Sequence, residues 1–232
     1  MRWIDRWRGR RWSQLAVVNL RILLGFAFLP AGLKKVLGQP FTDPGNSGSF
    51  HEFLHAFYAT GVFYPFVGAV QLAIAFLLMT QTYATLGAVM ALPVITSIAV
   101  FCWSTGVVPT AVVVTFMLAG NLVLLLWDAD RWIGILRPNR LERTASATLS
   151  RPGAPVPSAL IDLALWRLCG FAILAFYGLT CLLHGGVYRP RGLDFRSPEF
   201  YALPIIALFP VVTLILERRR RKRAAGRPTG SE

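Results

Sequence analysis

Long apolar runs dominate the hydropathy pattern of this chain. Each of six runs holds about twenty residues, which is the length that a helix needs to cross a bilayer. The runs occupy residues 15–33, 62–79, 83–103, 107–127, 159–183 and 200–216. Very short connections join the second, third and fourth runs, so we expect these three to pack as antiparallel neighbours. The pattern therefore predicts an all-α, polytopic membrane protein.

Composition and charge support this class and add an orientation. Of the 232 residues, 55% are hydrophobic and 15% are charged, whereas soluble domains carry about a quarter charged residues. The formal net charge is +13. Most Lys and Arg residues lie in the N-terminal segment, in the 128–158 loop and after the last run, all on one side of a six-span chain. The positive-inside rule then predicts that both termini are cytoplasmic.

The same pattern divides the chain into segments. We expect a basic, Trp-rich cytoplasmic N-terminus, a four-span bundle, a Pro-rich cytoplasmic linker, a two-span block and a basic cytoplasmic tail, at 1–14, 15–136, 137–158, 159–216 and 217–232. A run of cations beside a membrane span is typical of contact with anionic lipid. Nucleic acid is not expected as a partner, because no aromatic residues interleave the charges of the tail.

One string between the first two runs matches a catalytic motif. His51, Glu52 and His55 form HExxH, the pattern of zinc hydrolases. The extended motif with a third His is absent. The neighbouring apolar residues instead form one helical stripe of Phe50, Phe53, Leu54, Phe57 and Tyr58. We therefore favour a short helix lying on the outer membrane surface at about 49–60, with metal binding or a hydrolase site as alternatives.

A second constellation consists of three polar residues inside the predicted spans. Counting residues from the inner ends places Arg21 and Asn121 about 9 Å deep and Gln71 about 12 Å deep. A guanidinium needs acceptors, and the two amide carbonyls are candidates. Such a layer is net positive and suits an anion or a carbonyl oxygen. In the alternative interpretation, Arg21 snorkels to the cytoplasmic surface while Gln71 and Asn121 bond between helices.

Several of these positions resemble the opening pattern of the DoxX family of small bacterial membrane proteins. They are Arg21, Gly25, Gly32 and Lys34. A Phe-rich polar segment at 50–58 and the stretches 67–72 and 85–88 resemble later segments of the family pattern. The likeness covers about residues 15–136, and the two spans after the linker lie outside the usual pattern.

The resemblance implies a four-helix transmembrane bundle in the bacterial cytoplasmic (inner) membrane, associated with redox chemistry. Some members are subunits of quinone-linked sulfur oxidoreductases, and others accompany oxidative-stress proteins. We therefore expect a non-catalytic subunit or accessory component, with a quinone as ligand near Arg21, Gln71 and Asn121. Its partners would be a redox subunit or a second copy of the chain. Members often have a glutamate where this chain has Gln71, and an amide cannot titrate. The alternative is a carrier or permease that passes a small anion or small molecule through the same polar layer.

Overall fold

The computed structural model describes residues 6–130, 132, 160–187 and 201–225. Within these ranges the chain is helical and has no strand, which confirms the predicted all-α class. The helices are α2 (Arg11–Val36), α3 (Ser49–Tyr58), α4 (Phe63–Met79), α5 (Ala84–Ser104), α6 (Val108–Trp127), α9 (Leu163–His184) and α10 (Ala202–Ala225). Each of the six apolar runs overlaps one of the long helices.

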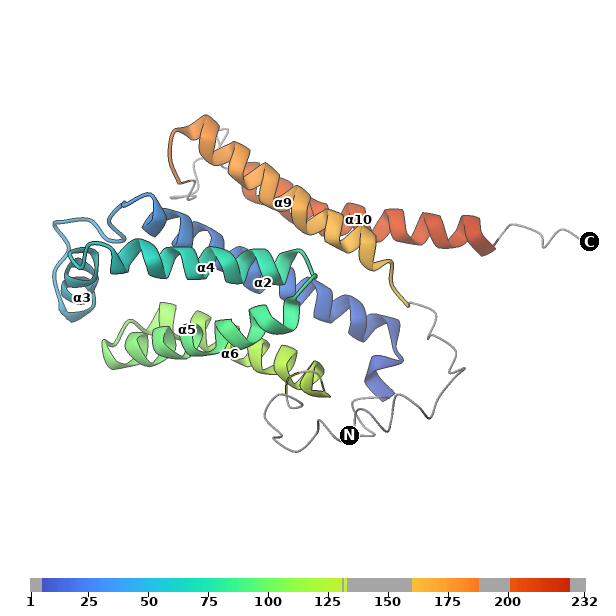
Figure 1. Ribbon diagram of the computed structural model, residues 1–232, viewed down its shortest axis with the longest axis horizontal. Coiled ribbons are helices and arrows are strands. Elements are labelled where there is room, and N and C mark those ends of the chain that lie inside the picture. Colours follow the sequence, from blue (N-terminus) through green and yellow to red (C-terminus); the bar gives the residue numbers. More distant parts are fainter. Residues whose placement is uncertain (1–5, 131, 133–159, 188–200, 226–232) are drawn as a thin grey trace, which may run out of the picture.

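The helices form three layers (Figure 1). The central layer is α2 packed against α4, the α5–α6 hairpin covers one side of it, and α9 of the α9–α10 hairpin contacts α4 on the other side. The start of α2 and the end of α10 lie at one end of the molecule, and α3 lies at the opposite end (Figure 1). We call these two ends the inner and the outer end.

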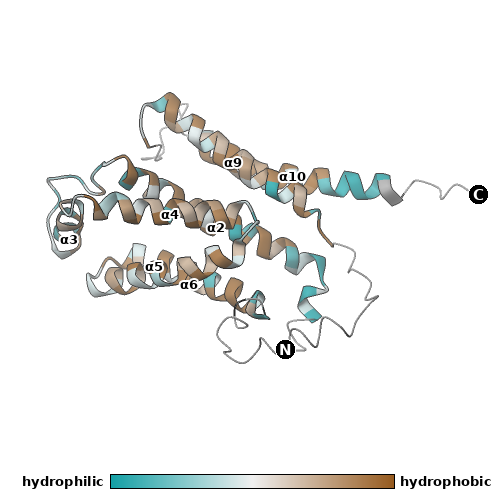
Figure 2. Ribbon diagram, viewed as in Figure 1, coloured by the Kyte–Doolittle hydropathy of each residue, from teal (hydrophilic) through white to brown (hydrophobic). Residues whose placement is uncertain are grey.

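Four of the helices are long and apolar enough to cross a membrane, namely α2, α5, α6 and α9. Helices α3 and α4 together pass the same test but are bent by 97° at the break between them, so they form either a broken span or a re-entrant loop. Figure 2 shows hydrophobic residues along these helices, whereas α10 changes from hydrophobic to hydrophilic along its length. The chain is therefore a membrane protein by its helix length and composition.

Glycines allow the close contact between α2 and α4. A Cβ atom on Gly68 would lie 2.7 Å from the carbonyl oxygen of Gly32, so only glycine lets the two backbones approach this far. Nearer the inner end, a Cβ atom on Gly25 would meet Met79. The antiparallel register is thus set: Gly32 lies level with Gly68, and Gly25 lies level with the last turn of α4.

A buried carboxylate joins the α9–α10 hairpin to the start of α2. Glu217 of α10 is fully buried and forms ion pairs with Arg221 at 3.1 Å and with Arg11 of α2 at 3.6 Å. The indole Nε1 of Trp166 in α9 donates a hydrogen bond to the same carboxylate at 3.2 Å. Because a buried charge is stable only when it is paired, Glu217 fixes three helices relative to one another at the inner end.

Candidate functional site

Arg21 is the centre of a polar network at the inner end of the central layer. Its Nη1 donates a hydrogen bond to Oε1 of Gln81 at 3.1 Å, and its Nη2 donates to Oδ2 of Asp128 at 2.6 Å. Thr85 donates to the same Asp128 oxygen at 3.0 Å. All three residues that form the centre (Arg21, Gln81 and Asp128) are buried. The guanidinium is thus held between an amide and a carboxylate.

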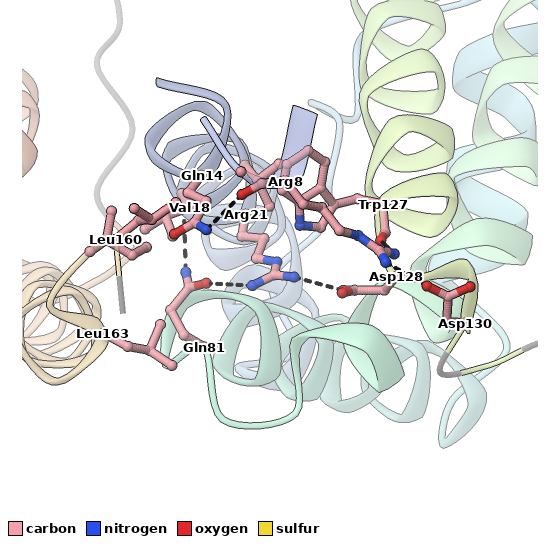
Figure 3. Close-up of a pocket in the computed structure, with 13 residues that line it drawn as sticks. Arg8, Gln14, Val18, Arg21, Gln81, Trp127, Asp128, Asp130, Leu160 and Leu163 are labelled. Carbon is pink, nitrogen blue, oxygen red and sulfur yellow. Dashed lines mark hydrogen bonds and ion pairs between the residues drawn. The ribbon is translucent and has the colours of Figure 1, made fainter. Parts of the chain in front are cut away.

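Three different elements bring these groups together. Arg21 lies on the face of α2 that packs against α4, Gln81 lies in the turn between α4 and α5, and Asp128 follows the last residue of α6. The amide of Gln81 is itself fixed, because its Nε2 donates to the carbonyl oxygens of Leu78 at 3.0 Å and Val18 at 3.5 Å. Figure 3 shows the amide and the carboxylate on opposite sides of the guanidinium.

A pocket of about 630 Å³ lies beside this network (Figure 3). Its wall combines polar and apolar side chains, among them Gln14, Arg21, Gln81 and Asp128 with Val17, Val18, Leu160, Ile161 and Leu163. At a second charged position of the wall, Arg8 donates to the carboxylate of Asp130 and to the carbonyl oxygen of Trp127. Two arginines and two aspartates therefore line the pocket, and their charges cancel.

Gln71, which the sequence placed in one layer with Arg21, lies elsewhere. It is buried beside Gly32 and accepts a hydrogen bond from Nζ of Lys35 at 3.0 Å. Gly32 is eleven residues beyond Arg21 on α2, a separation of about 16 Å along the axis. The expected depth is wrong because α2 and α4 do not end at one level: α2 begins at Arg11, whereas the last turn of α4 lies level with Gly25, fourteen residues further along α2.

Asn121 also makes its hydrogen bond away from Arg21. It is fully buried, and its Nδ2 donates to the carbonyl oxygen of Ala88 at 3.1 Å. This bond joins α6 to α5, and the bond of Gln71 joins α4 to α2. Both amides therefore bond between helices, as the alternative interpretation expected. Arg21 follows neither interpretation, because it stays buried and uses Gln81 and Asp128 as acceptors.

The positions that carry the family resemblance have different roles in the structure. Gly25 and Gly32 lie at the contact between α2 and α4. Of the two lysines that end α2, Lys34 is half-buried, whereas Lys35 is buried. Lys35 also donates to the carbonyl oxygen of Ala31 at 3.1 Å, and its Nζ lies 4.6 Å from the ring centre of Phe41. Of the two lysines, Lys35 is thus the one whose side chain is buried between the helices.

The HExxH string lies on α3 at the outer end, within the predicted 49–60 segment. Nδ1 of His51 lies 2.5 Å from Oγ1 of Thr42, and Phe53 packs on Phe101 of α5 with ring centres 4.4 Å apart. Across the described ranges, no group of three His, Cys, Asp or Glu side chains is placed to hold a metal ion. The described residues therefore add no third ligand to His51, Glu52 and His55 of the motif.

Two residues of the network were missed by the sequence analysis, and each lies just outside an apolar run. Gln81 is in the three-residue connection after the second run, and Asp128 is the first residue after the fourth run. Because they lie outside the apolar runs, the hydropathy pattern predicts that such residues belong to loops. The sequence did contain a signal for the partner of Arg21. Asp128 is an acidic residue at the inner end of a span, on the side that holds most of the Lys and Arg residues.

The arrangement suits a ligand with an apolar body and an uncharged polar end, because the charges of the wall cancel and five of its thirteen residues have aliphatic side chains. No family model, no curated protein and no solved structure matches the chain. The DoxX resemblance accordingly stays a prediction.

Proposed function

We propose that this chain is a DoxX-like integral membrane protein of the bacterial inner membrane, which serves a membrane redox system as a non-catalytic subunit. In this proposal the pocket beside Arg21 holds a quinone. The observation that carries the proposal is the composition of the pocket wall: a buried guanidinium fixed by Gln81 and Asp128 faces aliphatic side chains such as Val17 and Leu163.

A quinone fits such a wall by its chemistry. Its carbonyl oxygens accept hydrogen bonds from guanidinium and amide N–H groups, while its ring and its isoprenoid chain pack on aliphatic side chains. Because Gln81 and Asp128 already fix the orientation of Arg21, little entropy is lost in ordering that side chain when a ligand binds. The role that we assign to these residues is to bind and to orient the ligand.

The charge balance of the pocket favours this proposal over an anion carrier. The carrier hypothesis drew on a net-positive polar layer. In the structure Asp128 lies 2.6 Å from Arg21, and Asp130 forms an ion pair with Arg8. A free anion entering the pocket would meet both carboxylates, whereas an uncharged ligand would not be repelled by them.

The proposal is tested by measuring the binding of a short-chain quinone to the purified protein in lipid nanodiscs. Leu163→Trp fills part of the pocket, so we expect the affinity to fall by at least about tenfold. The control is Leu168→Trp, which places the same bulk on an exposed position of the same helix and should leave the affinity unchanged.

Two outcomes would refute the quinone assignment: no saturable binding to the unmodified protein, or equal affinity in the two tryptophan variants. Counterflow uptake of a small anion by proteoliposomes, together with absent quinone binding, would establish the carrier instead.

A further inference from the structure

Three long helices of this protein end in a residue with left-handed backbone geometry, which is glycine in two of them and glutamine in the third. In α2, α4 and α5 the residue after the C-cap has a positive φ: 65° at Gly38, 58° at Gln81 and 71° at Gly106. Among all described residues, Gln81 is the single non-glycine with a positive φ. Glycine is the usual residue at this position, because a Cβ atom is sterically disfavoured in the left-handed region. The end of α4 therefore carries a local steric cost that the ends of α2 and α5 avoid.

The side chain of Gln81 accounts for this exception. It is buried, and both ends of its amide are used: Nε2 donates to two backbone carbonyls, and Oε1 accepts from Arg21. The two carbonyls accept only from the nitrogen, so they fix the orientation of the amide and turn its oxygen toward the guanidinium. A glycine would relieve the backbone but would leave one side of Arg21 without this acceptor.

We propose that Gln81 is a positioning residue, which holds the Arg21 guanidinium at the pocket wall in the orientation that binds the polar end of the ligand. Strained backbone conformations concentrate at functional sites, where the surrounding structure maintains them. The identity of the ligand rests on the proposed function, whereas the action of Gln81 on Arg21 does not.

The test compares Gln81→Gly and Gln81→Asn with the unmodified protein in nanodiscs. Glycine keeps the backbone geometry without the amide, and asparagine tolerates the left-handed region but is one methylene too short to bond Arg21. We expect both to lower the affinity for a short-chain quinone by about tenfold, the effect of one lost hydrogen bond to a charged group, while the melting temperature stays within a few degrees.

The matched control makes the opposite substitution, glycine to glutamine, at the end of α5. A Cβ atom on Gly106 would meet no atom within 4 Å, so Gly106→Gln introduces the backbone strain alone. It should lower the melting temperature and leave quinone affinity unchanged. Wild-type affinity in Gln81→Gly would overturn the inference and leave the proposed function standing.

A second measurement needs no ligand and separates the two proposals. Phenylglyoxal modifies arginines, and mass spectrometry gives the rate at Arg21. A guanidinium released from Gln81 moves more freely at the pocket wall, so we expect the rate in Gln81→Gly to rise by about tenfold. If the protein binds no quinone but this rate rises, the proposed function fails and the positioning role stands. An unchanged rate overturns the positioning role.

Discussion

Helix α2 carries two buried cations with contrasting surroundings. Arg21 and Lys35 are fourteen residues apart, so they lie on nearly the same face of the helix, about 21 Å apart along its axis. Arg21 is bound by the carboxylate of Asp128 and lines a pocket. Lys35 is bound by the amide of Gln71 and lies against the ring of Phe41. One helix thus places a cation paired with a carboxylate at the inner end and a cation bonded to an amide and packed on an aromatic ring at the outer end.

The contrast separates a binding role from a packing role. At the outer end the lysine lies beside the closest backbone contact, where Gly32 and Gly68 leave little free space. At the inner end a pocket opens beside Arg21, and its carboxylate partner keeps the site neutral. The contrast fits our proposal that the Arg21 end binds a ligand, whereas the Lys35 end lies at the contact between α2 and α4.

The largest effect is expected where the ion pair is broken. Asp128→Leu leaves the buried guanidinium without its carboxylate, which should reduce the free energy of unfolding by about 3–5 kcal/mol. Denaturant unfolding in mild detergent measures the change. The control is Asp130→Leu, because the side chain of Asp130 is 49% exposed and such a pair contributes less than about 1 kcal/mol. Equal losses in the two variants would contradict the contrast between buried and surface pairs.

At the outer end the strongest effect should come from the backbone contact. The added methyl of Gly68→Ala would lie 2.7 Å from the Gly32 oxygen and from Cβ of Lys35, and overpacking of this kind destabilises by up to about 3 kcal/mol. Gly178→Ala is the matched control, since a Cβ atom there meets nothing within 4 Å. Melting temperatures of the two variants decide the point, and a Gly68→Ala protein as stable as the control would refute the close contact.

Removal of the outer cation should have a smaller effect. Lys35→Met leaves the carbonyl of Gln71 without this donor, and we expect a loss of about 1–2 kcal/mol in the free energy of unfolding. Gln71→Leu in the same chain removes the acceptor as well. The double variant should therefore lose less than the sum of the single variants, and strict additivity would show that the two side chains are not coupled.

The smallest effect is expected at the ion pair of Arg8 with Asp130. Both side chains are partly exposed, so Arg8→Gln should change the free energy of unfolding by less than about 1 kcal/mol. The difference should shrink further as salt is raised, because exposed charges are screened. Unfolding curves at low and high salt measure it. A large loss of unfolding free energy that persists in high salt would show that the Arg8–Asp130 pair behaves like the buried pair of Arg21 and Asp128, and would contradict this prediction.

Run length and periodicity were enough to predict the helices but not the partners of Arg21. Each of the six apolar runs overlaps a helix, and the stripe from Phe50 to Tyr58 lies on a helix. Hydropathy missed the first turn of α2, because most residues from Arg11 to Gln14 are polar. Counting depths from the ends of the apolar runs also assumed that α2 and α4 end at one level, which they do not.

The contacts of the site depend on tertiary structure, which no local pattern encodes. The positive φ of Gln81 reflects the way α4 ends against α2, since its amide bonds the carbonyl of Val18 in α2 as well as Leu78 in its own helix. Asp128 reaches Arg21 only because α6 returns to the inner end beside α2. A single sequence offers the residue types for such a network, whereas the pairing depends on the packing.

The ion pair between Arg11 and Glu217 also bears on the order in which the protein assembles. Ribosomes make the arginine early and the glutamate late, so the helices between them enter the membrane before this pair can close. Until α10 has been synthesised, the chain lacks Glu217, whose carboxylate joins the α9–α10 hairpin to α2. The last helix therefore completes the inner end, and a nascent chain arrested before Glu217 should dock α9 without this link.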